Sequence, residues 1–261
     1  MKSRTWRPER RNRKSGTAAA GHGQANRMTI PQCRLDRFGR DTRYYERVRP
    51  SRVEKLAIGS TDIWVLFEQP RENFTYGCSP EDAVHLLSLL PEEDVELIDC
   101  LVFRQPTRKQ VSRCPVWGRL QYLAMIGSFI GPAVLLEAQE VGAKIKWGRK
   151  LNVEDQAELE RLKSDGHDIQ ETSRGWIFTL SEQSIRQTLL YRTLLHEIGH
   201  WVHYETEVLW DRALDVEQPD GHADIFFARP SRELEQFAHA YAAKTGKRLK
   251  DAGHVPFDPL K

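Results

Sequence analysis

The stretch Leu194-Leu195-His196-Glu197-Ile198-Gly199-His200-Trp201-Val202 decides how the rest of the chain is interpreted. On an α-helix, two histidines four residues apart project from one face, about one turn from each other. That spacing allows two imidazoles to hold one zinc ion. Glu197 lies beside them and is not needed as a ligand, so its carboxylate can take a proton from a water that the metal activates. The stretch therefore predicts a zinc site with His196 and His200 as ligands and Glu197 as the general base.

The sequence around this stretch predicts the helix that the site needs. Over residues 184–204, apolar residues recur at the spacings of a helix buried along one side, and no proline interrupts them. The alternative is an ordinary core helix that carries two partly exposed histidines and a solvated glutamate, because a five-residue pattern is short enough to arise by chance. The long helical context favours the metal interpretation.

A catalytic zinc ion usually takes three protein ligands and leaves one position for water, so a third ligand must come from elsewhere. Residues 230–243 predict a second helix with Ser231 as its N-cap and Gly246 just past its end. Glu235 lies beside the apolar stripe of this helix (Leu234, Phe237, Ala238 and Tyr241), which is expected to dock against the first helix. We therefore predict Glu235 as the third ligand.

Other residues compete with Glu235 for this role. Glu233 is two residues away and points to nearly the opposite side of the helix, so we expect it to be solvated. His203 lies about 10 Å along the helix axis from His196, too far to share one ion with it. His222 and Asp224, in the segment between the two helices, remain alternative ligands.

The two motifs in this order resemble the zincin metallopeptidases. The H-E-x-x-H helix is followed by Glu235-x-Phe237-Ala238-x-x-Tyr241-Ala242, a pattern similar to the glutamate-bearing helix of gluzincins of the lethal-factor type, over about residues 174–245. The resemblance implies an α+β fold, in which a mixed β-sheet packs on an active-site helix and on a C-terminal glutamate-bearing helix. It also implies a zinc-dependent peptidase with a peptide or protein substrate. The chain departs from this pattern at residue 239, where it has a histidine and that type has a glutamate.

The group that stabilises the oxyanion is left open by the sequence. His239 follows Glu235 by one turn and can orient a ligand or donate to an oxyanion, or it can simply be hydrogen-bonded in the helix packing. His222, Tyr204 and Tyr241 are the other candidates.

Short apolar runs elsewhere predict the sheet. Strands are expected over residues 63–67, 94–103, 122–130 and 133–138, with a turn at Gly131-Pro132 between the last two, and over 175–180. The strand at 175–180 precedes the histidine-bearing helix, and the resemblance implies that such a strand runs along the cleft and pairs with an extended peptide. Helices are expected over residues 80–90, capped by Ser79, and over 152–162, capped by Asn152, with Val153, Leu159 and Leu162 on one face.

Composition divides the 261 residues into two parts. Residues 1–50 carry a net charge of +10, so the remainder carries −8. Residues 1–30 hold few large aliphatic side chains, and we expect a disordered basic tail there, followed by a metallopeptidase domain over 31–261. The tail is a weak candidate for nucleic-acid binding, or it is translated sequence upstream of a start at Met28.

The chain shows no apolar run of the length that a signal peptide or a membrane span needs, and its four cysteines form no C-x-x-C pair. These features predict a cytoplasmic protein, or an effector exported without a cleaved signal. Two rival functions belong to other classes. One is a zincin scaffold that serves as a sensor or binding module, and the other is an interaction protein with a structural metal. The absence of a helix-turn-helix pattern counts against the first, and the presence of Glu197 counts against the second.

Overall fold

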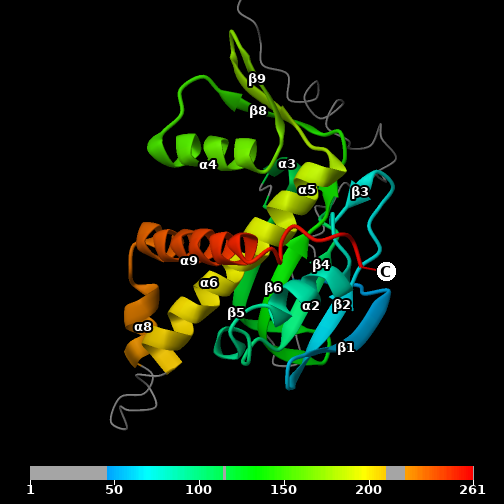
Figure 1. The fold of residues 1–261 in the computed structure, drawn as a ribbon, viewed down its shortest axis with the longest axis vertical. Helices are drawn as coiled ribbons and strands as arrows, with labels where there is room; N and C mark the ends of the chain where they lie inside the picture. Colours follow the sequence, from blue (N-terminus) through cyan, green and yellow to red (C-terminus); the bar gives the residue numbers. More distant parts are fainter. Residues whose placement is uncertain (1–45, 114–115, 210–220, 261) are drawn as a thin grey trace, which may run out of the picture. The chain divides into compact units, whose positions relative to one another are not determined.

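The computed structural model describes residues 46–113, 116–209 and 221–260 (Figure 1). The expected tail, residues 1–30, lies outside the described residues, as do the first fifteen residues of the expected domain. The described chain is an α+β fold, as the sequence predicts, with helices packed on a mixed sheet. None of its described helices combines the length and the apolar composition that a membrane span requires.

The main sheet has five strands in the order β1-β2-β4-β6-β5. Strands β2, β4 and β6 are parallel to one another, whereas β1 and β5 run antiparallel to their neighbours and form the two edges. The bounds are β1 Arg52–Ile58, β2 Thr61–Phe67, β4 Cys100–Arg104, β5 Gly118–Ile126 and β6 Phe129–Glu137.

The central strands are apolar because both faces of the sheet are covered there. All five residues of β4 are buried. Alternate residues face opposite sides: Leu101, Phe103 and Leu136 join the large core under the helices, whereas Val102 and Leu135 join a smaller cluster on the other face.

The hairpin of β5 and β6 differs from the prediction of a turn at Gly131-Pro132, which is wrong. The chain turns at Gly127-Ser128, where Gly127 has a φ of 63°, and Pro132 lies inside β6. The register shifts between Gln121 and Ala124, so two residues of β5 bulge opposite Pro132. Pairing with β4 begins only at Ala133. Pro132 therefore removes no hydrogen bond from the ladder, and its missing N–H is tolerated.

A second difference concerns the strand at 175–180. It forms as β10 (Gly175–Thr179), but it is the central strand of a separate three-stranded sheet between β8 (Lys144–Gly148) and β9 (Asp168–Thr172). Both of its edges are paired, so it has no edge to offer to a peptide, and its expected role along the cleft is wrong. Two short strands, β3 (Phe74–Thr75) and β7 (Gln139–Glu140), form a third sheet.

The capped helices follow the sequence closely. Helix α2 (Pro80–Ser88) begins at Ser79, whose side chain accepts a hydrogen bond from the Asp82 N–H, and α4 (Val153–Ser164) begins at Asn152. Val153 is expected on the inner face of α4, but it is 72% exposed. Leu159 comes six residues later, and six residues leave a net rotation of about 240° around the helix axis, so the two side chains point to different faces.

The strand expected over 94–103 is half as long as predicted. A 3₁₀ turn, η3 (Glu92–Asp94), precedes it, and pairing begins only at Cys100. Val95 and Ile98 lie between this turn and β4, and both are buried in the core. Their apolar side chains therefore pack in the core without being part of a strand. A short helix, α3 (Arg108–Arg113), follows β4.

The histidine-bearing segment is one continuous helical run. It consists of α5 (Glu182–Thr188), a π turn η4 (Leu189–Thr193), α6 (Leu194–Tyr204) and a second π turn η5 (Glu205–Leu209). Helix α6 packs on β5 and β6, and α9 (Ser231–Asp251) crosses over α6 (Figure 1). A short helix, α8 (Gly221–Phe227), precedes α9.

Two predicted ends of α9 are wrong. Pro230 occupies the N-cap position without a side-chain hydrogen bond, so Ser231 is the first residue of the helix and not its cap. Gly246 lies inside the helix, which runs to Asp251, because the residues after it continue to pack: Leu249 is buried in the core.

Candidate metal centre

Helix α6 presents His196 and His200 one turn apart, as the sequence predicts. Their Nε2 atoms lie 3.1 Å from each other, and their rings meet at 85° with centroids 4.7 Å apart. Burial, and then the neighbouring His196, lower the pKa of His200 to about 4, so this imidazole is neutral at pH 7. Two ring nitrogens at this distance leave room for one proton or one cation between them.

Glu235 approaches this pair from α9. Its carboxylate oxygens lie 3.2 Å from Nε2 of His196 and 3.6 Å from Nε2 of His200. The hydrogen bond with His196 lowers the pKa of Glu235 against the opposing effect of burial, and the carboxylate is therefore ionised at neutral pH. Glu233, two residues earlier, is exposed, as predicted.

These three distances allow a test of whether the residues fit a zinc ion. In a tetrahedral site with zinc–ligand distances of about 2.0–2.1 Å, neighbouring ligand atoms are about 3.3 Å apart. The observed separations of 3.1, 3.2 and 3.6 Å bracket this value. Two imidazoles and one carboxylate are also a donor set that zinc accepts. The residues therefore fit a zinc ion with one position open.

His239 belongs to the same cluster. Its ring lies 4.4 Å from the ring of His196, and one ligand atom from each of His196, Glu235 and His239 lies within 4.8 Å of the others. Nε2 of His200 lies 3.1 Å from Nε2 of His196 and 3.6 Å from a carboxylate oxygen of Glu235, distances that one ion can bridge, so we take His200 as the ligand and His239 as its neighbour. Burial, and then His196, lower the pKa of His239 to about 4, so its ring is neutral and can donate one hydrogen bond at pH 7.

Glu197 is held beside the ligands by the sheet. It is buried, and its Oε2 accepts a 2.7 Å hydrogen bond from the backbone N–H of Leu120 in β5. Burial raises the pKa of the Glu197 carboxyl to about 7, the range in which a carboxylate exchanges protons with water most effectively at neutral pH.

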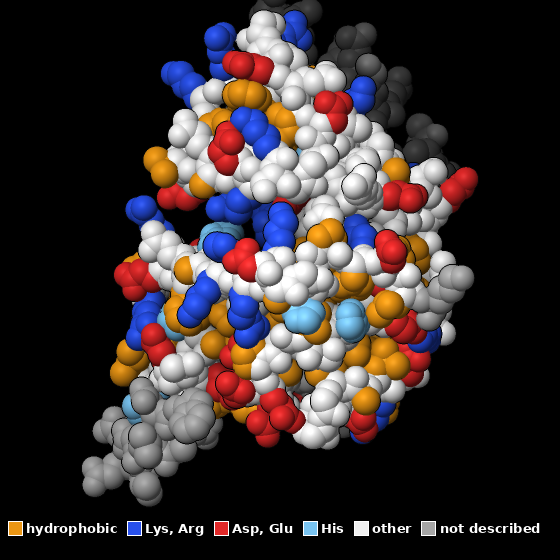
Figure 2. All heavy atoms as spheres, in the orientation of Figure 1, with side chains coloured by type: hydrophobic (Ala, Val, Ile, Leu, Met, Phe, Trp, Pro, Cys, Tyr) orange, Lys and Arg blue, Asp and Glu red, His pale blue; other side chains and the backbone are white. Residues whose placement is uncertain are grey.

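Two hollows flank the cluster, and His196, Glu197 and Glu235 line both of them. The first, called here the Tyr122 pocket, has a volume of about 320 Å³. The second, the Arg192 pocket, has a volume of about 280 Å³. Figure 2 shows a hollow between α4 and α9 with a histidine side chain at its floor and Lys and Arg side chains at its rim. The further lining residues are Gly118, Arg119, Leu120, Tyr122, His200, Phe227, Ser231 and Leu234 in the first pocket, and Val116, Trp117, Gly118, Arg192, Thr193 and His239 in the second.

Larger hollows lie elsewhere on the described chain. Two of them hold about 550 Å³ and 520 Å³, the first beside Phe74 and the second against the strands around Trp64. Neither contains the three grouped histidine, cysteine or acidic ligands that a metal needs. The candidate metal ligands therefore lie at the smaller hollows.

Strand β5 forms the wall opposite α9. The carbonyl of Trp117 accepts a 2.8 Å hydrogen bond from the N–H of Glu137 in β6. In an antiparallel pair, successive residues of a strand direct their backbone N–H and C=O groups alternately toward and away from the partner strand, so those of Gly118 and Leu120 point away from β6. The hydrogen bond from Leu120 to Glu197 agrees with this direction. This edge of the sheet thus faces the cluster with its backbone.

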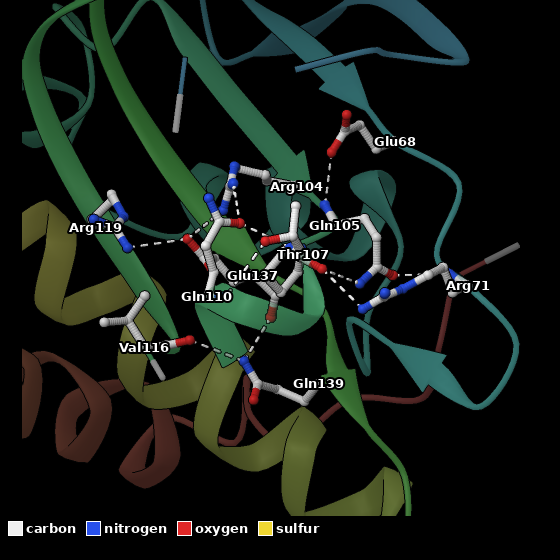
Figure 3. A network of polar contacts seen from close by, with 11 residues as sticks. Glu68, Arg71, Arg104, Gln105, Thr107, Gln110, Val116, Arg119, Glu137 and Gln139 are labelled. Atoms are coloured by element: carbon white, nitrogen blue, oxygen red, sulfur yellow. Dashed lines mark hydrogen bonds and ion pairs between the residues drawn. The ribbon is translucent and has the colours of Figure 1, made fainter. Parts of the chain in front are cut away.

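A buried ionic network supports β5 from behind (Figure 3). Glu137 of β6 lies 2.9 Å from Arg104 of β4 and 3.1 Å from Arg119 of β5, and its side chain is only 3% exposed. Arg104 also donates to Gln110 at 2.7 Å. One carboxylate therefore ties three neighbouring strands together at the end of the sheet beside the cluster.

The remaining candidates lie farther from the cluster. The hydroxyl of Tyr241 donates to Asp94 of η3 at 2.5 Å, and the ring of Tyr204 packs on Tyr122. His203 is buried, contacts Glu207 at 2.9 Å and stacks on Phe237, so it holds helices together. His222, Asp224, Tyr204 and Tyr241 line neither pocket and are not in the metal-ligand group.

Several residues of the site were not anticipated from the sequence. Tyr122, Phe227, Arg192 and the backbone of Leu120 all lie at the pockets. No motif marks them, because they come from a sheet edge, a short helix and the turn before α6. A sequence signal exists only for Arg192, which precedes His196 by one helical turn and therefore shares its face.

Comparisons of the chain with protein-family models, with curated proteins and with solved structures find no match.

Proposed function

We propose that the protein is a zinc-dependent metallopeptidase with a zincin-like, gluzincin-type site. The observation that supports this proposal is the convergence of His196, His200 and Glu235 at tetrahedral spacing, with the buried Glu197 beside them. The mixed sheet under the histidine-bearing helix and the glutamate on a later helix agree with the resemblance described above. His196, His200 and Glu235 would hold the zinc ion.

A zinc ion bound there supplies a Lewis acid for the substrate carbonyl and lowers the pKa of water towards 7. Glu197 accepts the proton of the attacking water and then delivers it to the leaving amine. The backbone of Leu120 holds one oxygen of Glu197 in place, so the carboxylate keeps its orientation through both transfers. His239 is neutral and, unlike His222, Tyr204 and Tyr241, it lines one of the two pockets, so we propose it as the donor to the carbonyl oxygen.

The two pockets favour an endopeptidase. Binding space lies on both sides of Glu197, along α6 and the edge of β5, so a chain can continue in both directions from the reacting bond. An extended peptide can add to the edge of β5 through its backbone.

The alternative is a binding module on the same scaffold that takes up metal without hydrolysis. The ligand cluster suits both functions equally. The buried position and the raised pKa of the Glu197 carboxyl favour the enzyme. Burying a carboxyl costs solvation free energy, and a residue that only filled space would have no function to offset that cost.

Metal analysis and hydrolysis measured on the same preparations test the proposal. The purified chain should bind about one zinc ion, and His196→Ala should abolish this binding. Glu197→Gln should keep the zinc ion but lose at least about 100-fold in hydrolysis of an unstructured protein, because an amide of the same size accepts no proton. Absence of zinc under zinc-replete conditions would refute the site. Equal turnover by the wild type and Glu197→Gln would refute the mechanism.

A further inference from the structure

We propose that the Tyr122 pocket is a subsite that selects a bulky apolar side chain on the amino side of the cleaved peptide bond. This inference rests on the proposed peptidase function, because it assigns a substrate preference to the same groove. It also predicts binding of apolar peptide segments, which can be measured without turnover.

The first step concerns the lining of the pocket. Phe227 of α8 is 51% exposed beside the cluster, and Tyr122 and Leu234 complete the apolar surface. The pocket volume of about 320 Å³ lies at the lower end of the range for small-molecule sites and suits a single side chain.

The second step concerns rigidity. The ring of Phe227 meets the ring of Tyr122 at 74° with centroids 5.1 Å apart, and both rings pack on Tyr204 of α6 at 5.7 Å and 4.7 Å. The contact between Phe227 and Tyr122 is edge-to-face, one of the arrangements that aromatic pairs prefer. Tyr122 also lies at the bulge of β5, a feature that redirects side chains beside functional sites. The wall therefore exists before a ligand arrives.

The third step concerns direction. Strand β5 runs alongside α6 in the same sense: Gly118 lies against Thr193, Leu120 bonds to Glu197, and Tyr122 packs on Tyr204. A peptide that pairs with the edge of β5 in the slightly more stable antiparallel sense runs the opposite way. Residues on the amino side of the reacting bond then lie over Tyr122, and residues on the carboxyl side lie over the Arg192 pocket.

Arg119 offers a competing preference, because it also lines the Tyr122 pocket and could attract an acidic side chain. Its guanidinium is bound at 3.1 Å to the buried carboxylate of Glu137, which also pairs with Arg104, and the Arg119 side chain is only 19% exposed. We therefore expect the aromatic wall, and not Arg119, to decide the preference.

The experiment uses the zinc-loaded full-length chain and a peptide mixture whose cleavage positions are read by mass spectrometry. Three matched peptides then carry Phe, Ala or Glu at the preferred position on the amino side. We expect a ratio of about 10–100 between the kcat/KM values for the Phe and Ala peptides, the range for filling an apolar pocket. Phe227→Ala should narrow this ratio at least about fivefold. Ile225→Ala is the matched control, since Ile225 is on the same helix and 65% exposed but does not line the pocket, and it should leave the ratio unchanged.

A binding measurement separates this inference from the proposed function. Zinc-loaded Glu197→Gln should bind the Phe peptide at least about tenfold more tightly than the Ala peptide, and adding Phe227→Ala should remove most of the difference. If zinc binds and no peptide is cleaved, the peptidase proposal fails, and the binding ratio alone decides the subsite. Equal binding of the Phe and Ala peptides, a preference for Glu, or selection of apolar residues only on the carboxyl side would overturn the inference.

Discussion

Gly199 of α6 lies directly against Ala238 of α9. A Cβ atom placed on Gly199 would be 3.0 Å from the Cα of Ala238 and 3.1 Å from its carbonyl oxygen, and also 3.0 Å from the Cβ of Tyr241. The absence of a side chain at Gly199 thus allows the two helices to approach closely. Glu235 lies one turn before Ala238, and His196 and His200 flank Gly199, so this approach brings the three proposed ligands together.

Gly199→Ala should therefore separate the helices and weaken the site. We expect a loss of about 1–3 kcal/mol in the free energy of unfolding, the usual cost of overpacking, with a clear loss of zinc affinity. Gly246→Ala is the matched control. Its Cβ would meet Leu195 at an ordinary 3.7 Å, and it should stabilise α9 by about 0.5–1 kcal/mol. Urea unfolding and zinc titration measure both effects. Unchanged zinc affinity in Gly199→Ala would contradict the inference that the close approach of α6 and α9 positions the proposed ligands.

Glu235→Ala should weaken zinc binding by more than about 100-fold. The variant leaves two neutral imidazoles to hold a divalent ion and removes the one anionic ligand. Glu233→Ala removes an exposed carboxylate two residues away and should change the affinity by less than about twofold. Competition with a chromophoric chelator gives both constants. Retention of near-normal affinity in Glu235→Ala would direct attention to His239 as the third ligand.

Glu137→Gln should destabilise the fold although the two side chains have nearly the same shape. The substitution leaves Arg104 and Arg119 without the buried carboxylate between them, and we expect a loss of about 3–5 kcal/mol in the free energy of unfolding. Glu140→Gln, at an exposed position in β7, should change it by less than about 0.5 kcal/mol. Chemical denaturation provides the comparison, and equal stability of the two variants would show that the network contributes little.

Asp82 makes the stability of the chain depend on pH. Burial alone would raise the pKa of its carboxyl, but the Arg186 side chain at 2.6 Å and the N–H groups of Leu260 and Ser79 outweigh burial, and the pKa falls below its ordinary value of 3.8. A carboxyl whose pKa is lower in the folded state than in the unfolded state stabilises the fold at any pH above its unfolded-state pKa. This stabilisation is lost as the pH falls towards and through the folded-state pKa.

Asp82→Asn should thus cost about 3 kcal/mol at pH 7, and the difference from the wild type should shrink once the pH falls below about 3.8. Unfolding curves from pH 7 to pH 3 measure the difference. Glu160→Gln, in which a largely exposed ion pair with Lys163 is lost, should show a difference of under about 1 kcal/mol at every pH. A difference between the wild type and Asp82→Asn that stays constant across the range would exclude ionisation as its source.

Several features were predictable because their causes are local. Ser79 and Asn152 cap helices through contacts three residues away, and the pentapeptide of α6 sets its own geometry through the helical period. The predictions that failed depended on partners distant in sequence. Pro132 looked like a turn residue because the bulge opposite it in β5 is invisible in the sequence, and β10 looked like a cleft strand because nothing local marks β8 and β9 as its neighbours.

Local sequence was sufficient for the helical phase that aligns His196 with His200, for Glu197 beside them and for the choice of Glu235 over Glu233, because a helix repeats every 3.6 residues wherever it lies. Tertiary packing alone decided the rest of the site. It selected β5 as the wall, directed the Leu120 N–H at Glu197 and assembled the aromatic pocket from Tyr122 and Phe227. These contacts join residues up to about one hundred positions apart, and their geometry follows from how closely helices and sheet approach, which no short stretch of sequence encodes.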